Sequence, residues 1–469
     1  MKKIAIAGAS GFVGSNLIPE LSKKYSIIAL GRTARKSDSP NIEWKQTELF
    51  STSSTIEALK GIDVAIYLVH SMMPSSRLFQ GNFHDTDLLL ADNFSRACKE
   101  NQIKHIIYLG GLVPEGYISP HLKSRQEVEG VLKDSGVPVT VLRAGMVVGP
   151  GGSSFEILRS LVKKLPFMVL PKWTQSTTQA IFIDDVLSVV KETIENEDLK
   201  NKTLNVVNGE SLTYETILRQ TAQGLNLQRH MLPVPIASTG FSKLWVQIFG
   251  NSSYELVSPL IESLLCDLPQ LNPPKELSSV IKYKTFTSMI QETLKRDQGQ
   301  PLVRPKRKIK TEDTVRSIQR LPSVPKTCHW IAEEYMRWLP NFFPVFLMIR
   351  TSPQTHLIEF RFTFLKKPLL VLQYIKESFD IEREKFHIVG GFLTRTTSTG
   401  WLEFRQIEHK KYLLASIHEF VPSLPWYLYI LTQAPVHKFV MMAFGKHLKK
   451  TFQQDENQVK VQKNFKEIP

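Results

Sequence analysis

The hydrophobic and polar positions of the first 150 residues follow a pattern that is typical of a layered α/β domain. Short apolar runs, of the kind found in strands buried on both faces, alternate with amphipathic stretches that have helical spacing. The strands predicted by this pattern lie at 2–7, 26–31, 42–47, 64–69, 105–110 and 138–143. The helices lie between them, over 55–60, 83–99 and 125–135. We therefore expect a doubly wound parallel sheet with helices on both faces.

The first apolar run ends in a glycine series, Gly8, Gly11 and Gly14. In a nucleotide-binding turn, such glycines allow a tight strand exit, a close backbone approach to a pyrophosphate and a close crossing of helix and strand. The helix predicted from Phe12 would direct its N–H groups at the phosphates. The strand before the turn, the apolar helix after it and the strand that follows favour a dinucleotide site over an ordinary glycine-rich turn.

The strand over 26–31 is followed by two arginines, Arg32 and Arg35. A cofactor without a 2′-phosphate usually needs a carboxylate here for its ribose hydroxyls, whereas guanidinium groups pair with a phosphate dianion. These residues favour NADP over NAD, and a solvated basic turn is the alternative. Glu48, after the strand over 42–47, is a candidate acceptor for the adenine amine or else an exposed loop acid.

Five stretches together resemble an atypical short-chain dehydrogenase/reductase of the NAD(P)-binding, NmrA-like and YbjT-like branch. They are "GASGFVG" at 8–14, "AIYLVHSM" at 65–72, "IIYLGGL" at 106–112, "HLKSRQEVEGVLKDSGVPVTVLRAGMVVGPG" at 121–151 and "FIDDVL" at 182–187. The resemblance covers the chain to about residue 290. It implies a Rossmann domain, an NADP site at the glycine turn and a small substrate cap built from segments after Gly149.

The sequence departs from this family at the residues that carry its usual chemistry. Active members have a Tyr and a Lys four residues apart on a helix and a Ser at the end of the preceding strand. Here the corresponding residues are His121, Arg125 and the pair Gly110 and Gly111.

His121 and Arg125 are our candidate catalytic pair. Residues i and i+4 share a helix face, so both side chains can face one pocket. An imidazole can donate or accept a proton near neutral pH, whereas an arginine binds ribose or a carboxylate without exchanging a proton. The alternative is that His121 caps the helix and Arg125 holds the cofactor ribose, with no turnover.

The predicted cofactor site combines the glycine turn with the carboxyl ends of the strands, where such sheets bind their ligands. Its residues are Gly8, Ser10, Gly11, Phe12, Val13, Gly14, Arg32, Arg35, Glu48, Leu49, Val69, His70, Arg125 and Ala144. Apolar groups after Gly149 could wall a substrate cavity or belong to plain core. They are Phe155, Leu158, Leu161, Phe167, Met168 and Trp173. Helical spacing over 232–271 suggests short helices over the mouth of the site.

At 469 residues the chain is too long for a single core. We expect an NAD(P)-binding domain with its cap over 1–295, a basic linker over 296–326, a second domain over 327–450 and a polar tail over 451–469. The net charge of +15 comes mostly from the linker and the second domain. A near-neutral N-terminal domain argues against a nucleic-acid partner.

In the second domain, apolar and polar residues alternate with the period of two that is typical of strands. Antiparallel strands are predicted over 356–364, 386–397, 400–408 and 411–422, with a closing helical segment over 426–450. The motif "GWLEF" at 400–404 and the aromatic last segment resemble the uncharacterised domain fused behind YbjT-like proteins. Such domains are similar to helix-grip, START-like cups, so the resemblance implies an α+β domain that encloses an apolar ligand.

The remaining features concern location and partners. Cys98, Cys266 and Cys328 have no metal or redox spacing, which predicts a reducing compartment and no metal site. No apolar run is long enough for a transmembrane helix, so we expect a cytoplasmic protein. The basic cluster at 304–310 and the aromatic segment together suit weak contact with an anionic membrane. A last helix buried in its own domain is the alternative, and the oligomeric state is not predicted.

Two functions are compatible with these features. The first is an NADP-dependent oxidoreductase or isomerase that acts on a small apolar substrate, such as a lipid-like or quinone-like molecule. The second is a non-catalytic NADP-binding sensor or assembly factor. The missing Tyr, Lys and Ser favour the second function, and an apolar-ligand domain favours the first.

Overall fold

The structure is a computed structural model with two compact units. It describes residues 1–33, 35–37, 39–71, 76–235, 262–298, 312–343, 346–352, 354, 356–375, 381–395 and 399–466. The basic cluster at 304–310 and most of the predicted helices over 232–271 lie outside these residues. The first unit comprises Met1–Met73 and Asp87–Lys308, and the second comprises Pro74–Thr86 and Ile309–Pro469. A short segment from the N-terminal half of the chain therefore belongs to the second unit.

The first unit is built on a seven-stranded parallel sheet with the order β11-β7-β6-β4-β1-β2-β3. Its strands are β1 (Lys3–Ala7), β2 (Ser26–Gly31), β3 (Ile42–Gln46), β4 (Val64–Tyr67), β6 (His105–Gly111), β7 (Val139–Ala144) and β11 (Thr203–Val206). The strand order reverses between β1 and β4, which is the point where ligands bind in doubly wound sheets. The predicted Rossmann fold is confirmed.

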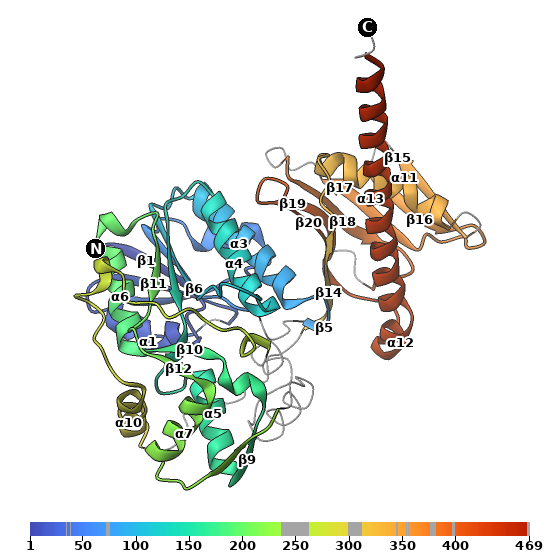
Figure 1. Ribbon diagram of the computed structural model, residues 1–469. Coiled ribbons are helices and arrows are strands. Elements are labelled where there is room, and N and C mark those ends of the chain that lie inside the picture. The colour runs from blue at the N-terminus through green and yellow to red at the C-terminus, as the bar shows by residue number, and fades with distance from the viewer. Residues whose placement is uncertain are drawn as a thin grey trace. The chain divides into compact units, whose positions relative to one another are not determined.

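Helices cover both faces of this sheet (Figure 1). They are α1 (Phe12–Leu21), α2 (Thr52–Ala58), α3 (Phe83–Glu100), α4 (Pro120–Asp134) and α6 (Ile183–Glu195). Leu17 and Leu21 of α1 pack with Val186 and Val190 of α6 against the strands, in one apolar core. Helices α3 and α4 lie together on the other side of the sheet (Figure 1).

Segments after Gly145 form the cap. Its elements are β8 (Met146–Val148), α5 (Ser153–Lys164), β9 (Phe167–Leu170), β10 (Thr177–Phe182), β12 (Ser211–Thr213), α7 (Tyr214–Gly224), β13 (His230–Pro233) and α10 (Phe286–Arg296). Short 3-10 turns lie at Lys172–Gln175, Glu197–Leu199 and Lys275–Leu277. Phe167 is 72% exposed, so its predicted place in a cavity wall is wrong. Its strand alternates Phe167 and Val169 outward with Met168 and Leu170 inward.

The glycine turn has the tight geometry that its sequence predicts. Gly8 has a φ of +85°, and a Cβ on it would lie 2.8 Å from the backbone of Leu68. A Cβ on Gly14 would lie 2.5 Å from the carbonyl oxygen of Gly8. The N–H of Gly11 donates to that same oxygen at 2.9 Å. Helix α1 therefore approaches the turn more closely than any side chain would permit.

The second unit is a mixed sheet of eight strands with helices on it, and it has the predicted α+β character. The order is β15-β16-β17-β18-β19-β20-β14-β5. The strands are β5 (Ser76–Gln80), β14 (Glu312–Leu321), β15 (Leu347–Ser352), β16 (Leu357–Phe362), β17 (Leu370–Ile375), β18 (Arg383–Gly390), β19 (Trp401–Ile407) and β20 (Tyr412–Phe420). All neighbours are antiparallel except β14 and β5.

The described part of the second unit also contains the helices α11 (Cys328–Phe342), α12 (Trp426–Leu431) and α13 (Gln433–Lys466). Helices α11 and α13 lie against the sheet (Figure 1). The rings of Tyr335, Phe404 and Phe444 contact one another in the space between them. Among the described residues, no helix is long and apolar enough to cross a membrane.

Two segments differ from their predicted roles. Residues 312–321, expected in a basic linker, form the inner strand β14, because Val315 and Leu321 reach the core of the second unit. Residues 451–466, expected in a polar tail, continue helix α13. The edge strand β5 has no counterpart in the prediction, and its Leu78 packs on the same core.

We expect Gly14→Ala to destabilise the first unit. The added Cβ meets backbone atoms of Gly8 and Ala9, which cannot rotate away as a side chain could, so the free energy of unfolding should fall by about 1–3 kcal/mol. Denaturant titration of the purified protein measures this change. Gly116→Ala is the control, because a Cβ there meets nothing within 4 Å. Equal stability of the two variants would contradict the close approach.

Candidate functional site

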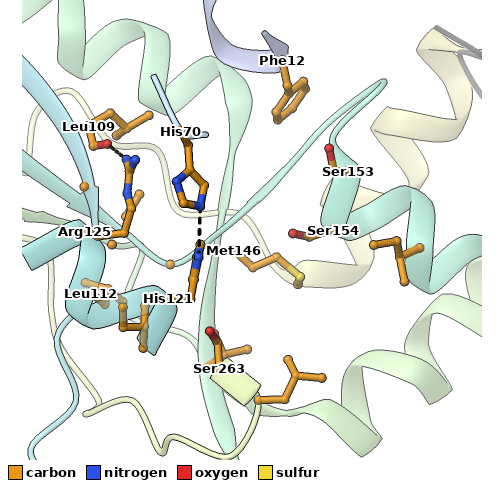
Figure 2. A pocket seen from close by; sticks show the side chains of 18 of the residues that line it. Phe12, His70, Leu109, Leu112, His121, Arg125, Met146, Ser153, Ser154 and Ser263 are labelled. Carbon is orange, nitrogen blue, oxygen red and sulfur yellow. Dashed lines mark hydrogen bonds between the residues drawn. The ribbon is translucent and has the colours of Figure 1, made fainter. Parts of the chain in front are cut away.

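A cavity of about 430 Å³ runs from the glycine turn into the cap (Figure 2). At one end it is lined by the turn and by the carboxyl ends of the central strands. At the other end it is lined mainly by apolar side chains of the cap. These are Met146, Ile157, Leu158, Leu161, Trp173, Leu218, Leu264 and Leu268. Leu158, Leu161 and Trp173 are three of the six cavity residues expected from the sequence.

The turn end of the cavity fits the pyrophosphate of a dinucleotide. Only glycine can occupy the positions of Gly8 and Gly14, so the backbone there is open to a close ligand. Gly11 caps helix α1 without a side-chain hydrogen bond, so no capping side chain covers the first N–H groups of the helix. These groups and the helix dipole suit an anion at this place.

The structure brings eight of the predicted cofactor residues to the cavity wall. They are Gly8, Gly11, Phe12, Val13, Gly14, His70, Arg125 and Ala144. The other six do not line it. They are Ser10, Arg32, Arg35, Glu48, Leu49 and Val69.

Arg32 and Arg35 follow β2 at the edge of the sheet that carries the turn. Ala7 of β1 pairs with Leu30 of β2, so the two strands end side by side. Arg32 is exposed, and the guanidinium carbon of Arg35 lies 4.3 Å from the centre of the Trp44 ring. This ring holds the Arg35 side chain through a cation–π contact.

Glu48 and Val69 make local contacts. A side-chain oxygen of Glu48 accepts a hydrogen bond from the N–H of Phe50 at 3.1 Å. The carbonyl of Val69 accepts one from Arg125 at 3.2 Å. Both residues thus bond to other parts of the protein and do not line the cavity.

Asp87, His70 and His121 form a hydrogen-bonded chain at the middle of the cavity. An oxygen of Asp87 lies 2.6 Å from Nδ1 of His70, and Nε2 of His70 lies 3.0 Å from Nδ1 of His121. The second Asp87 oxygen accepts from the N–H of Ser71 at 2.7 Å. Both histidines line the cavity, and Figure 2 shows the bond between their rings. The Asp87 side chain is 1% exposed.

Charges and burial determine the protonation of this chain. Burial alone would raise the pKa of Asp87, but His70, Arg125 and the Ser71 N–H together hold that pKa below its usual value. Burial, with help from His70 and Arg125, lowers the pKa of His121 well below 6.5. An ionised Asp87 requires a proton on Nδ1 of His70, so that Nε2 faces His121.

The chain can therefore hold His121 in two forms. When Nε2 of His70 is unprotonated, it accepts the Nδ1 proton of His121, and Nε2 of His121 is a proton acceptor. When one further proton lies on His70, His121 carries its own proton on Nε2 and is a donor. Asp87 stabilises the charge of the second form, as a buried carboxylate does for the histidine of a catalytic triad.

Arg125 connects two strand ends rather than exchanging protons. One nitrogen of its guanidinium donates to the carbonyl of Val69 at 3.2 Å, and another donates to the carbonyl of Leu109. Its guanidinium carbon lies 5.0 Å from the centre of the Tyr108 ring, and the Tyr108 hydroxyl donates to the Arg125 carbonyl. The structure thus gives Arg125 a positioning role beside His121.

Sequence reasoning missed Asp87. The signal for it was present, because Asp87 begins the apolar stripe of α3 that continues through Leu90, Ala91 and Phe94. An acid at the head of a buried helix face needs a partner. The partner, His70, follows a different strand, and only the fold brings the two together.

The comparisons with known proteins agree with this fold. Residues 8–163 match the model of a family described as NAD(P)H-binding. Auxiliary protein GraX of Staphylococcus aureus is 28% identical over 191 residues, which are 39% of this chain and 57% of GraX. The chain thus spans little more than half of that relative. UDP-glucose 4-epimerase of Vibrio cholerae is 22% identical over 317 residues, 60% of this chain and 94% of the epimerase.

Two solved structures have the same fold as the first unit. A nucleoside-diphosphate-sugar epimerase of Staphylococcus aureus aligns with a TM-score of 0.50 at 16% identity, over 62% of this chain and 100% of its own. A triphenylmethane reductase of a Citrobacter species, solved with NADP(H), aligns with a TM-score of 0.50 at 18% identity, over the same shares. The first unit thus has a Rossmann fold, and its residues 8–163 are similar to the NAD(P)H-binding family.

We expect the stability of the first unit to fall as the pH falls below about 6.5. The unfolded chain takes up a proton at His121 in this range and the folded chain does not, because the folded pKa lies well below 6.5. His105, whose pKa burial lowers to about 4, acts in the same direction. The stability is fully present above the unfolded pKa and is lost on acidification toward the folded pKa.

Denaturant titrations between about pH 5 and pH 7.5 measure this dependence. Each such proton contributes up to about 1.4 kcal/mol per pH unit. The variant His121→Gln should show a shallower dependence than the unaltered protein and keep the part due to His105. An unchanged slope in the variant would show that His121 is not held neutral by the fold.

Proposed function

We propose that this protein is an NADP-dependent oxidoreductase that acts on an apolar carbonyl or quinone-like substrate, with His121 as the proton-transfer group. The observation that carries the proposal is the chain from Asp87 through His70 to His121, which reaches a cavity that begins at a dinucleotide-binding turn. A titratable group held by a buried carboxylate at the wall of a cavity is what acid–base chemistry requires.

When bound, the nicotinamide would supply a hydride to the substrate carbon. His121 gives its Nε2 proton to the substrate oxygen as the C=O bond becomes a C–O–H group. The proton of His70 Nε2 then moves to Nδ1 of His121, and the chain reaches its other form. In the reverse direction, Nε2 of His121 accepts the hydroxyl proton.

The substrate class follows from the lining of the cavity. Most of the cap side chains there are apolar, and the hydroxyl groups among them are few. They belong to Ser153, Ser154, Thr178, Tyr214 and Ser263. Burial raises the pKa of the Tyr214 hydroxyl to about 12, which leaves it a hydrogen-bond donor at neutral pH. Such a wall suits a mostly apolar molecule with one or two oxygens better than a nucleotide sugar.

The preference for NADP rests on Arg32 and Arg35. They follow β2 beside the glycine turn, where a 2′-phosphate would lie, and the similar Citrobacter reductase was solved with NADP(H). For the second unit we propose a helix-grip-like domain, on the support of a long helix, α13, that lies along its sheet.

We expect NADP(H) to bind at least about tenfold more tightly than NAD(H), and the double variant Arg32→Ala/Arg35→Ala to lose this preference. Each charge-assisted hydrogen bond to the 2′-phosphate contributes about 1.5–3 kcal/mol, and NAD lacks that group. Isothermal titration calorimetry with each cofactor measures both affinities.

Lys23→Ala/Lys60→Ala is the matched control for this measurement. It removes the same charge from loops at the amino ends of the strands, opposite the glycine turn, and both lysines are exposed. The control should keep the preference. Equal affinities in the unaltered protein, or a preference that survives in the arginine variant, would refute the NADP assignment.

We expect His121→Ala to lower kcat by about 10²- to 10⁴-fold while NADPH affinity changes little. The imidazole gives or takes the proton in the transition state, and the cofactor is held by the turn. Steady-state kinetics with carbonyl and quinone substrates, together with NADPH titration, separate the two effects. His230→Ala, at an exposed histidine of β13, is the control and should retain the full rate.

Asp87→Asn tests the rest of the chain. It keeps the shape of the side chain but removes the charge that stabilises the protonated histidine pair, so the pH profile of kcat should shift to lower pH. Full turnover in His121→Ala would remove the catalytic role. NADPH binding without turnover of any substrate would instead support the non-catalytic sensor.

A further inference from the structure

One end of the sheet in the second unit is formed by loops that touch one another. Strands β16, β18 and β20 end there, and strands β15, β17 and β19 begin there. Backbone hydrogen bonds join Thr363 to Phe346 at 3.1 Å, Phe392 to Pro368 at 2.9 Å, and Ser423 to Leu393 at 3.0 Å. The described residues of four segments, 342–348, 363–369, 391–400 and 421–442, thus meet at this end, which we call the sheet tip.

The sheet tip exposes large apolar side chains from each of its segments. Each of the following is more than half exposed, from 53% for Phe439 to 75% for Leu431: Phe346, Phe364, Phe392, Tyr427, Leu431 and Phe439. Loop connections of soluble domains usually carry polar residues, and scattered single apolar residues need no explanation. Six exposed apolar side chains on neighbouring segments indicate a surface that contacts an apolar phase.

Helix α13 contributes to the tip with one face and to the core with the other. Val440, Met441 and Phe444 are buried in the core of the second unit. Phe439 is exposed, and its ring lies 5.8 Å from the ring of Phe342, which begins the first tip segment. The expectation of a last helix buried in its own domain therefore describes only one side of α13.

All charged side chains of the sheet tip are positive. The four segments contain Lys366, Lys367, Arg395 and Lys438, and they contain no Asp or Glu. Lys366, Lys367 and Lys438 are exposed. Aromatic side chains together with lysines are the residues that proteins place at the interface of a bilayer, and basic groups are attracted to anionic lipid.

We propose that the sheet tip is a peripheral docking surface for an anionic lipid bilayer. The aromatic and aliphatic side chains enter the interfacial region, and the lysines lie at the level of the lipid phosphates. A second copy of the chain is disfavoured as the occupant, because two tips of the same sign repel each other. The proposal is independent of the catalytic function, since it uses no residue of the cavity.

Flotation of the full-length protein with vesicles tests the proposal. Vesicles of phosphatidylcholine alone are compared with vesicles that also contain phosphatidylglycerol, at about 0.02 M and about 0.5 M salt. The protein should float with the anionic vesicles at low salt, and less of it should float at high salt. It should float weakly or not at all with the neutral vesicles.

Paired variants locate the contact. Lys366→Glu/Lys367→Glu should weaken binding to anionic vesicles by about tenfold or more, since each basic residue adds to the attraction. Phe392→Ser/Leu431→Ser should weaken binding at both salt concentrations, because it removes apolar contact. The controls change the other end of the same sheet: Lys410→Glu/Lys411→Glu between β19 and β20, and Ile381→Ser, which is 82% exposed. They should bind normally.

Any of three results would overturn the proposal. The first is absence of the protein from anionic vesicles at low salt. The second is equal binding of the tip variants and the controls. The third is a change of oligomeric state in the tip variants, by light scattering, without any change in vesicle binding, which would assign the tip to a second copy. Thermal unfolding of each variant confirms that the second unit is folded in the test.

Discussion

The buried carboxylate of Asp87 is the constraint on which the candidate site depends. A charge with 1% of its side chain exposed is stable only where partners replace its lost hydration. Here the partners are Nδ1 of His70, the N–H of Ser71 and the Ser124 hydroxyl, which donates to Oδ2 at 3.3 Å. This requirement fixes the tautomer of His70 and, through Nε2, the hydrogen-bonding state of His121 on α4. The segment after β4 and the helices α3 and α4 thus meet in one hydrogen-bonded chain at the switch point of the sheet.

Residues 76–86, which lie between His70 and Asp87 in the sequence, belong to the second unit. Its strand β5 pairs in parallel with β14, and Asp85 forms an ion pair with Arg320 of β14 at 2.7 Å. Asp85 and Asp87 lie in the first turns of the same helix, α3. In the sequence, the strand β5 of the second unit therefore lies between the two residues of the buried pair.

The site uses the scaffold of the reductases it resembles with different side chains. Gly110 and Gly111 offer no hydroxyl where those enzymes have a Ser, and a Cβ on Gly111 would lie 3.2 Å from Leu122. Arg125 lies where they have a Lys, and its guanidinium is bonded to two backbone carbonyls. In the function that we propose, an imidazole hydrogen-bonded to a second imidazole and, through it, to a carboxylate takes the proton-transfer role, instead of a tyrosine beside a lysine.

The sequence by itself determined the features that local periodicity records. Doubly apolar runs predicted the strands, the glycine series predicted the turn, and the spacing of His121 and Arg125 put them on one helix face. The tertiary structure alone decided which distant residues meet. It pairs Asp87 with His70 and β5 with β14, and it brings together the positively charged segments of the sheet tip. It also exposes Phe167, which was expected in the cavity wall, and it makes an inner strand, β14, of residues expected in a linker. The burial of a strand or helix face involves residues close in sequence, so it appears as a periodic pattern of apolar residues. The partner of a buried charge or of a strand edge lies far away in the sequence, so no local pattern identifies it.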